Sequence, residues 1–199
     1  KDIVIMFWQQ VHQFDQHITL AINSFHSTVS DQIWMFFSDK LVWIPMYVAI
    51  IVLLFWKLGW KRALVVMAAV LMTFGFCDQA SNFIKDIVCR IRPLNEAYML
   101  ENGLNVLEHA SSSFSFFSGH SANSFGLATC TVIGFRLDKR LKYNGYATWM
   151  FFWATMVAVS RIFVGKHYLG DIIVGSLVGI AAGFVFANIA RIIINRFLK

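Results

Sequence analysis

The segment SRIFVGKHYLGD, residues Ser160–Asp171, joins two long apolar runs of the chain. A polar segment between two such runs is expected where a membrane span meets water. His167 and Asp171 are four residues apart, so on a helix they would share one face, and the carboxylate could accept the Nδ1 proton. Nε2 would then be free as a nucleophile or base, with Arg161 and Lys166 supplying positive charge beside it. The segment therefore predicts either a charged helix junction at a membrane surface or a site for an anionic substrate.

The composition indicates an integral membrane protein. Of the 199 residues, 58% are hydrophobic and 14% are charged, whereas soluble domains are about 25% charged. We therefore expect an all-α helical membrane bundle that forms one domain over residues 1–199. The net charge is +6, but much of it lies in short loops rather than along one soluble face, so we expect no nucleic-acid partner. The three cysteines have no CxxC-like spacing, and we assign neither a disulfide nor a metal site to them.

Five apolar runs are long enough to be membrane spans. They cover residues 41–56 (or on to Trp60), 63–88, 118–135, 146–164 and 168–193. Residues 3–26 and 30–39 have apolar side chains at helical spacing with polar groups between them, which predicts helices that lie on the membrane surface. The chain thus divides into interfacial helices over 1–40 and a transmembrane bundle over 41–199, with a long loop at 89–116 that could bind substrate. A sixth span formed by residues 3–26 is the alternative.

Three further features of these segments predict contacts rather than chemistry. Asp78 lies in the polar half of the second span and is expected to pair with a buried base. Gly175 and Gly179 are four residues apart, which predicts close helix packing. The three histidines of the N-terminal region are expected to be interfacial polar groups; they are His12, His17 and His26.

The distribution of basic residues predicts the orientation of the bundle. Basic clusters occupy residues 57–62 and 136–142, and the C-terminus is also basic. With five alternating spans these regions share one side, which the positive-inside rule makes cytoplasmic. The junction at Ser160–Asp171 then lies on the opposite side. We therefore expect a bacterial inner-membrane protein whose site faces the periplasm or exterior.

Two more segments fall on that same side. One is KDIVCRIRP, residues Lys85–Pro93, in which Lys85 and Arg92 are seven apart, or two helical turns, and Pro93 would end the helix. The other is FSGH, residues Phe117–His120, which opens the third span. Backbone N–H groups at a helix start favour an anion. Together the segments predict an anion site of several fixed cations.

The order and spacing of the three segments resemble a known set of motifs. Lysine, six residues and Arg-Pro are followed by Ser-Gly-His, and then by Ser-Arg, five residues, His, three residues and Asp. These resemble the three motifs of the type 2 phosphatidic acid phosphatase (PAP2) superfamily, which contains integral-membrane lipid phosphatases, soluble acid phosphatases and vanadium haloperoxidases. The resemblance covers about residues 43 to 190. One position departs from it, because Phe117 stands where the family usually has proline; we expect activity to survive that change.

The resemblance implies a role for each motif residue. His167 would attack phosphorus and form a phosphohistidine, Asp171 would orient it, and His120 would protonate the leaving oxygen and then activate water. The residues implied in phosphate binding are Lys85, Arg92, Ser118, Gly119 and Arg161. No metal and no cofactor are implied.

The resemblance also implies a membrane lipid substrate without naming one. The candidates are undecaprenyl diphosphate, phosphatidylglycerophosphate, phosphatidate and lipid A phosphates, and no obligate protein partner is evident. A non-catalytic protein that binds or transports lipid phosphates is the alternative, supported only by Phe117. A haloperoxidase-like vanadate enzyme is a minor third option, against which the membrane spans argue.

Overall fold

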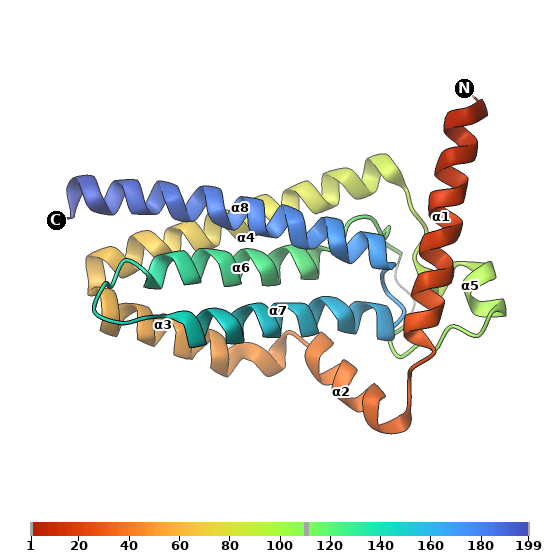
Figure 1. Ribbon diagram of the computed structural model, residues 1–199, viewed down its shortest axis with the longest axis horizontal. Helices are drawn as coiled ribbons and strands as arrows, with labels where there is room; N and C mark the ends of the chain where they lie inside the picture. The colour runs from red at the N-terminus through yellow and green to blue at the C-terminus, as the bar shows by residue number, and fades with distance from the viewer. Residues whose placement is uncertain (1, 110–111, 199) are drawn as a thin grey trace.

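The computed structural model describes residues 2–109 and 112–198, and this part of the chain is helical and contains no strands. Two N-terminal helices precede a bundle of longer ones (Figure 1). In chain order the helices are α1 (Asp2–Asn23), α2 (Thr28–Ser38), η1 (Leu41–Trp43), α3 (Ile44–Leu58), α4 (Trp60–Val88), η2 (Pro93–Asn95), α5 (Ala97–Glu101), α6 (Gly119–Phe135), α7 (Asn144–Phe163) and α8 (Leu169–Phe197).

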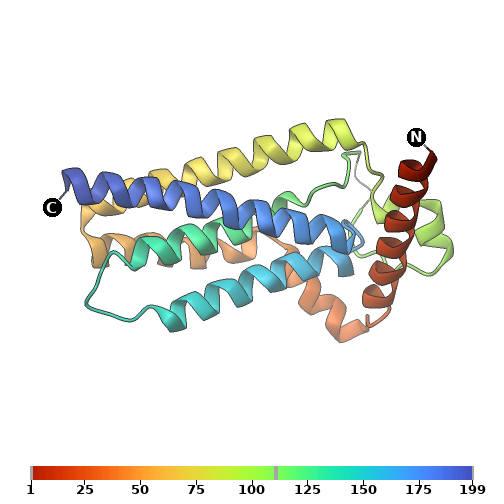
Figure 2. The same cartoon turned by 45° about the horizontal axis from the view of Figure 1, so that its top comes forward.

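The bundle consists of α3, α4, α6, α7 and α8, which run lengthwise beside one another (Figures 1 and 2). Each matches one predicted span to within a few residues, so the predicted all-α membrane bundle is confirmed. Within the described residues, three segments are long and apolar enough to cross a membrane: Leu41–Leu58, Trp60–Glu101 and Leu169–Phe197. The count of five spans stays a prediction, because α6 and α7 are not among them.

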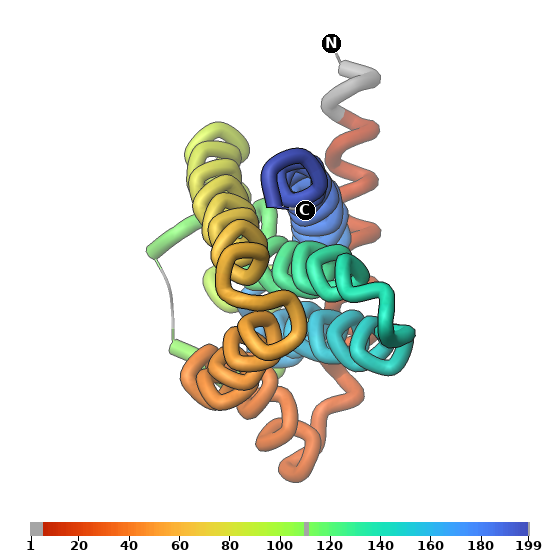
Figure 3. Tube along the Cα trace, turned by 90° about the vertical axis from the view of Figure 1, so that its left-hand side faces the viewer, coloured from red at the N-terminus to blue at the C-terminus, as the bar shows by residue number. Residues whose placement is uncertain are grey.

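Helix α6 packs against α4, α7 and α8 and forms the centre of the bundle, as the end-on view shows (Figure 3). It is only 17 residues long, and most of its side chains are buried. Its buried serines and threonines therefore face protein rather than lipid, which explains why a helix with several hydroxyl side chains can lie inside a membrane bundle.

The contact between α6 and α8 depends on glycine. A methyl group at Gly179 would lie 2.1 Å from the carbonyl oxygen of Ala122, and one at Gly175 would lie 2.5 Å from that of Ser118. Only a residue without Cβ allows the two backbones to come this close. The predicted packing face at Gly175 and Gly179 is confirmed.

Helix α1 crosses one end of the bundle instead of running alongside the other helices (Figures 1 and 2). It is attached to the bundle by side chain to backbone hydrogen bonds, such as the one from Asn23 Nδ2 to the carbonyl of Ile162 (3.1 Å). It is not among the described segments that are long and apolar enough to span. This placement favours an interfacial helix over a sixth span.

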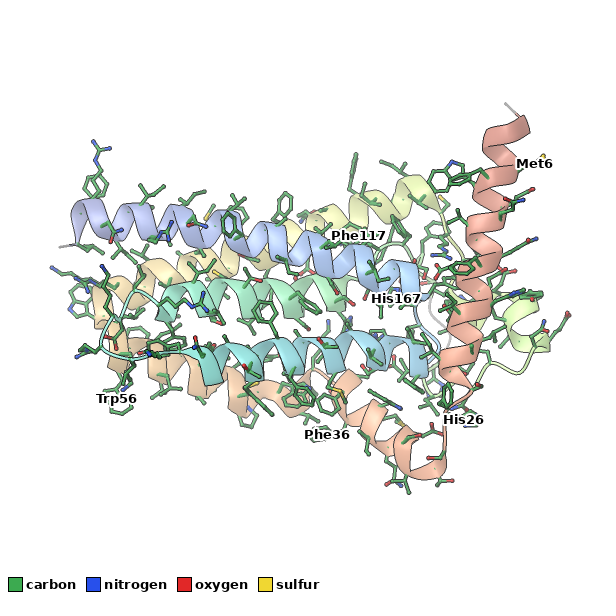
Figure 4. All side chains as sticks on the ribbon, viewed as in Figure 1. Met6, His26, Phe36, Trp56, Phe117 and His167 are labelled. Carbon is green, nitrogen blue, oxygen red and sulfur yellow. The ribbon has the colours of Figure 1, made fainter. Side chains whose placement is uncertain are left out.

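The basic clusters gather at the end of the bundle opposite α1. Arg140 Nη2 donates to the carbonyl of Lys57 (3.0 Å), and Arg62 Nη2 donates to that of Leu198 (3.2 Å). Trp56 and His167 lie toward opposite ends of the helix bundle (Figure 4). The fold therefore has the basic loops at one end of the bundle and the motif residues at the other, as the distribution of basic residues predicted.

The predicted loop 89–116 contains two short helices, η2 and α5. Two local expectations were wrong. Helix α4 does not continue to Arg92: it ends at Val88, Cys89 is left-handed (φ 49°) and Arg92 is extended. Pro93 accounts for the extended Arg92, because proline disfavours the helical region for the residue before it. Asp78 accepts a hydrogen bond from the Asn123 amide (2.7 Å) rather than pairing with a base.

Candidate active site

A polar cavity of about 330 Å³ lies at the end of the bundle that carries the motifs. Basic side chains and imidazoles dominate its lining, with two carboxylates among them. The charged and histidine residues that line it are Lys40, Lys85, Arg92, Arg161, Lys166, His120, His167, Asp78 and Glu108. Gly119 lines it as well. Six of the eight site residues expected from the sequence thus surround one cavity, while Ser118 and Asp171 are buried and do not line it.

His167 and Asp171 form a buried pair at the start of α8. His167 lies in the turn before the helix, so the expected shared helical face was wrong, yet its Nδ1 is 3.4 Å from Asp171 Oδ2. The carboxylate is held there because Oδ2 also accepts hydrogen bonds from the Tyr168 N–H (3.0 Å) and from the Ser115 hydroxyl. Helix capping therefore places the carboxylate behind the imidazole.

The contacts of the imidazole indicate its tautomer. Arg92 Nη1 lies 3.4 Å from His167 Nε2, and a guanidinium can only donate. Nε2 is therefore the acceptor, and Nδ1 carries the proton that faces Asp171. Burial lowers the pKa of His167 to about 4, with Asp171 opposing the shift and Arg92 adding to it. At neutral pH the ring is uncharged, with its Nε2 lone pair toward the cavity.

Arg92 is fixed at the cavity wall by the loop that precedes α6. Its Nε and Nη2 donate to the carbonyl and the hydroxyl of Ser113, both at 2.8 Å, and Nη1 donates to the carbonyl of Lys166 (3.2 Å). Arg92 and Arg161 are both buried. Two buried like charges facing one cavity are typical of a site for an anion.

Glu108 is a functional candidate that sequence reasoning missed. Its Oε1 accepts from Arg161 Nη1 (3.0 Å) and from the Ser38 hydroxyl (2.6 Å), and its Oε2 lies 3.5 Å from Lys166 Nζ. Burial alone would raise the pKa of Glu108, but Arg161, Ser38 and Lys166 together lower it. Arg161 and Ser38 lie 53 and 70 residues away in the sequence. No local signal could have found this contact.

The residues at the start of α6 have two different roles: Ser118 caps the helix, whereas Gly119 and His120 line the polar cavity. The Ser118 hydroxyl caps the helix by accepting from the Ser121 N–H (3.3 Å), and the Ser118 N–H donates to the Asp171 carbonyl (3.1 Å). Gly119 and His120 reach the cavity. Phe117 is buried, and its carbonyl accepts from the Ser81 hydroxyl (3.1 Å), which anchors the turn where the family usually has proline.

An apolar cavity of about 350 Å³ adjoins the polar one and shares Lys40, His120 and Asn123 with it. Its walls are side chains of α3, α4, α6 and α7, among them Tyr47 and Phe74. His120 therefore stands at the border between a charged and an apolar compartment. In the described part of the chain, no group of three or more His, Cys, Asp or Glu side chains could hold a metal ion.

The chain is similar in sequence to known proteins. Residues 59–193 match the PAP2 superfamily. The chain is 33% identical to a lipid A 4'-phosphatase of Bacteroides thetaiotaomicron over 89% of its own length and 77% of that protein. It is 31% identical to a lipid A 4'-phosphatase of Porphyromonas gingivalis, covering 89% of this chain and 74% of the relative.

Two crystal structures share the fold. A transmembrane PAP2-type phosphatidylglycerolphosphate phosphatase from Bacillus subtilis superimposes with a TM-score of 0.69 at 22% identity, covering 94% of this chain and 89% of the other. LpxE from Aquifex aeolicus superimposes with a TM-score of 0.63 at 23% identity, covering 86% and 93%. Taken with the three motifs around one cavity, these matches show that the chain belongs to the PAP2 superfamily.

Proposed function

We propose that this protein removes a phosphate from a lipid A-type phosphate through a phosphohistidine on His167, without a metal ion. The observation that carries the proposal is the polar cavity, in which the Nε2 lone pair of His167 faces a wall of fixed cations. Such a wall suits a phosphoryl group, whose charge must be stabilised as it transfers.

The coarser function rests on the relatives. Both curated relatives are lipid phosphatases that match most of this chain, so the protein is a phosphatase acting on lipid phosphates. Its apolar helices and its membrane relatives make it an integral membrane protein. The substrate, the intermediate and the orientation are finer points, which we propose from the site.

The proposed reaction has two steps. In the first, the His167 Nε2 lone pair forms a bond to phosphorus while the bond from phosphorus to the lipid oxygen breaks, and His120 gives a proton to that oxygen. In the second, His120 takes a proton from water, the water oxygen bonds to phosphorus, and the P–N bond breaks. Inorganic phosphate leaves, and both imidazoles return to their starting protonation states.

The neighbouring side chains support these roles. The Nδ1–H of His167 faces Asp171, so the charge that develops on the ring during attack meets a carboxylate. Lys85, Arg92 and Arg161 line the cavity and would hold the phosphoryl oxygens. Gly119 lines the cavity at the start of α6, where a backbone N–H favours an anion. Ser118 would contribute indirectly, because its hydroxyl caps the turn that holds Gly119 in place.

The adjoining apolar cavity supports a lipid substrate. A phosphoryl group in the polar cavity would leave its lipid portion beside the apolar one, and the two meet at His120. An acid at this border is well placed to protonate the oxygen that departs with the lipid. The relatives favour lipid A phosphates among the four substrate classes that the motifs imply.

The charge distribution supports one orientation. The basic loops and the C-terminus lie at the end of the bundle opposite the cavity, and the positive-inside rule favours a cytoplasmic location for that end. We therefore infer that the protein lies in the bacterial inner membrane and that its site faces the periplasm.

The test is phosphate release by the full chain in detergent, with a panel of lipid A 4'-phosphate, phosphatidylglycerophosphate, phosphatidate and undecaprenyl diphosphate, each with and without EDTA. We expect lipid A phosphate to react fastest, EDTA to have no effect, and His167→Ala to abolish release. His26→Ala, an exposed histidine outside the cavity, is the matched control and should retain activity. Binding without turnover on every substrate would refute the enzyme, and EDTA inhibition would refute the metal-free site.

A further inference from the structure

Arg90 links the carboxylate of Asp171 to the N-terminal helix α1. Its Nη1 donates to Asp171 Oδ1 and its Nη2 donates to Asp15 Oδ2, both at 2.7 Å. The Arg90 and Asp15 side chains are 14% and 13% exposed, and Asp171 is fully buried. Charge-assisted hydrogen bonds are among the stronger ones in proteins, and these two join residues 75 and 81 positions apart.

The second oxygen of Asp15 caps helix α8. Asp15 Oδ1 accepts from the Gly170 N–H (2.9 Å), and the Thr19 hydroxyl, one turn further along α1, accepts from the Leu169 N–H (3.0 Å). Both N–H groups belong to the first turn of α8, whose own backbone offers them no acceptor. Helix α1 therefore satisfies the end of the helix that carries Asp171.

The guanidinium is also held from the side. Its carbon lies 3.8 Å from the centre of the Tyr168 ring, and Nη2 lies 3.1 Å from His12 Nδ1. Tyr168 separates His167 from the first turn of α8. Ion pair, ring stacking and helix cap thus converge on the turn that sets the distance between His167 and Asp171.

We propose that Arg90 and Asp15 are positioning residues that hold Asp171 against Nδ1 of His167, so that α1 completes the active site from outside the lining of the cavity. This inference rests on the proposed phosphatase function. Asp15 lies outside the residues that match the PAP2 superfamily, and neither residue lines the polar cavity. Without the pair, Asp171 keeps the hydrogen bonds that its Oδ2 accepts from Tyr168 and Ser115 but loses the partner of its Oδ1. The acceptor that keeps the imidazole proton on Nδ1 is then held less firmly in place.

The kinetic signature follows from that placement. Substrate binding uses the cations of the cavity wall, and Arg90 and Asp15 do not belong to that wall, so KM should stay near its wild-type value. The attack by Nε2 needs the correct tautomer and alignment, so kcat should fall. Residues that act through a catalytic group change rates by about tenfold to a hundredfold when misplacement reaches roughly 1 Å.

The experiment measures kcat, KM and thermal stability in detergent for Arg90→Gln, Arg90→Lys, Asp15→Asn and the double variant Arg90→Gln/Asp15→Asn. Asp15→Asn keeps an oxygen for the Gly170 N–H but removes the charge that holds Arg90. Asp86→Asn, the same chemical change at an exposed position near the end of α4, is the matched control and should keep wild-type kcat.

We expect kcat to fall about tenfold or more in Arg90→Gln and several-fold in Asp15→Asn, with KM unchanged, partial recovery in Arg90→Lys, and no further loss in the double variant. If Arg90→Gln does not fold, Asp15→Asn alone decides. A folded Asp15→Asn with wild-type kcat, a rise in KM instead of a fall in kcat, or an equal loss in Asp86→Asn would overturn the inference. An inactive wild type would instead refute the proposed function, so the two failures are distinguishable.

Discussion

Replacing Gly175 with alanine should lower kcat, although Gly175 itself does not line the polar cavity. The new methyl group would lie 2.5 Å from the carbonyl oxygen of Ser118 and 3.3 Å from its carbonyl carbon. An ordinary contact begins at 3.4 Å, so the oxygen must retreat by about 0.9 Å. The obstacle is backbone, which cannot rotate away as a side chain could. The start of α6 must therefore move away from α8.

That movement separates the two halves of the proposed chemistry. His120 belongs to the first turn of α6, and Asp171 belongs to the first turn of α8 and sets the position of His167. A displacement near 1 Å between such groups costs up to roughly a hundredfold in rate. Overpacking of this kind costs about 1–3 kcal/mol in stability. We expect kcat to fall by about tenfold to a hundredfold, while the protein still folds.

The assay is phosphate release from lipid A 4'-phosphate in detergent, paired with a thermal melt of the same sample. Gly145→Ala is the matched control, because a methyl group at Gly145 meets no atom within 4 Å. It should keep wild-type kcat. A folded Gly175→Ala variant whose kcat equals that of Gly145→Ala would show that the close approach of α6 to α8 does not align the site.

Two further predictions concern the charges around the cavity. Glu108→Gln should strengthen inhibition by inorganic phosphate, on the order of tenfold in Ki, since it removes the carboxylate that occupies Arg161 and Lys166; an unchanged or weaker inhibition would contradict this. The melting temperature in detergent should fall between pH 6.5 and 4, because below pH 6.5 the unfolded chain protonates His167 while the folded chain, with a pKa of about 4, does not. The loss amounts to on the order of 3 kcal/mol, and His167→Gln, which binds no proton, should show a smaller fall with pH than the wild type.

Local pattern was sufficient for the helices and for the end of the bundle that carries the motifs. Apolar run length depends on neighbouring residues alone, so α3, α4, α6, α7 and α8 could be placed to within a few residues. The alternation of spans and the basic loops then placed the motifs at one end. The motif spacing also pointed to Lys85, Arg92, His120 and His167, which line one cavity.

Other features of the site could not be read from local pattern. The ion pairs of Arg90 with Asp15 and of Glu108 with Arg161 join residues 75 and 53 positions apart. No repeating pattern in the sequence indicates either ion pair. A contact between distant segments depends on how whole helices pack and not on the residues that neighbour each partner in the sequence. The extended backbone of Arg92, where two helical turns from Lys85 were expected, likewise follows from the left-handed Cys89, which no residue type there indicated.

The chain's own order of apolar runs and motif residues thus accounts for a membrane bundle with the motif residues gathered around a polar cavity at one end. Which charges meet inside that site was decided by tertiary packing: the close contact of α6 with α8 and the docking of α1 across the bundle end. The physical reason is the sequence separation over which each effect acts. Hydrophobic periodicity acts over one or two helical turns, whereas burying a carboxylate such as Asp171 requires a cation that only the folded chain brings to it.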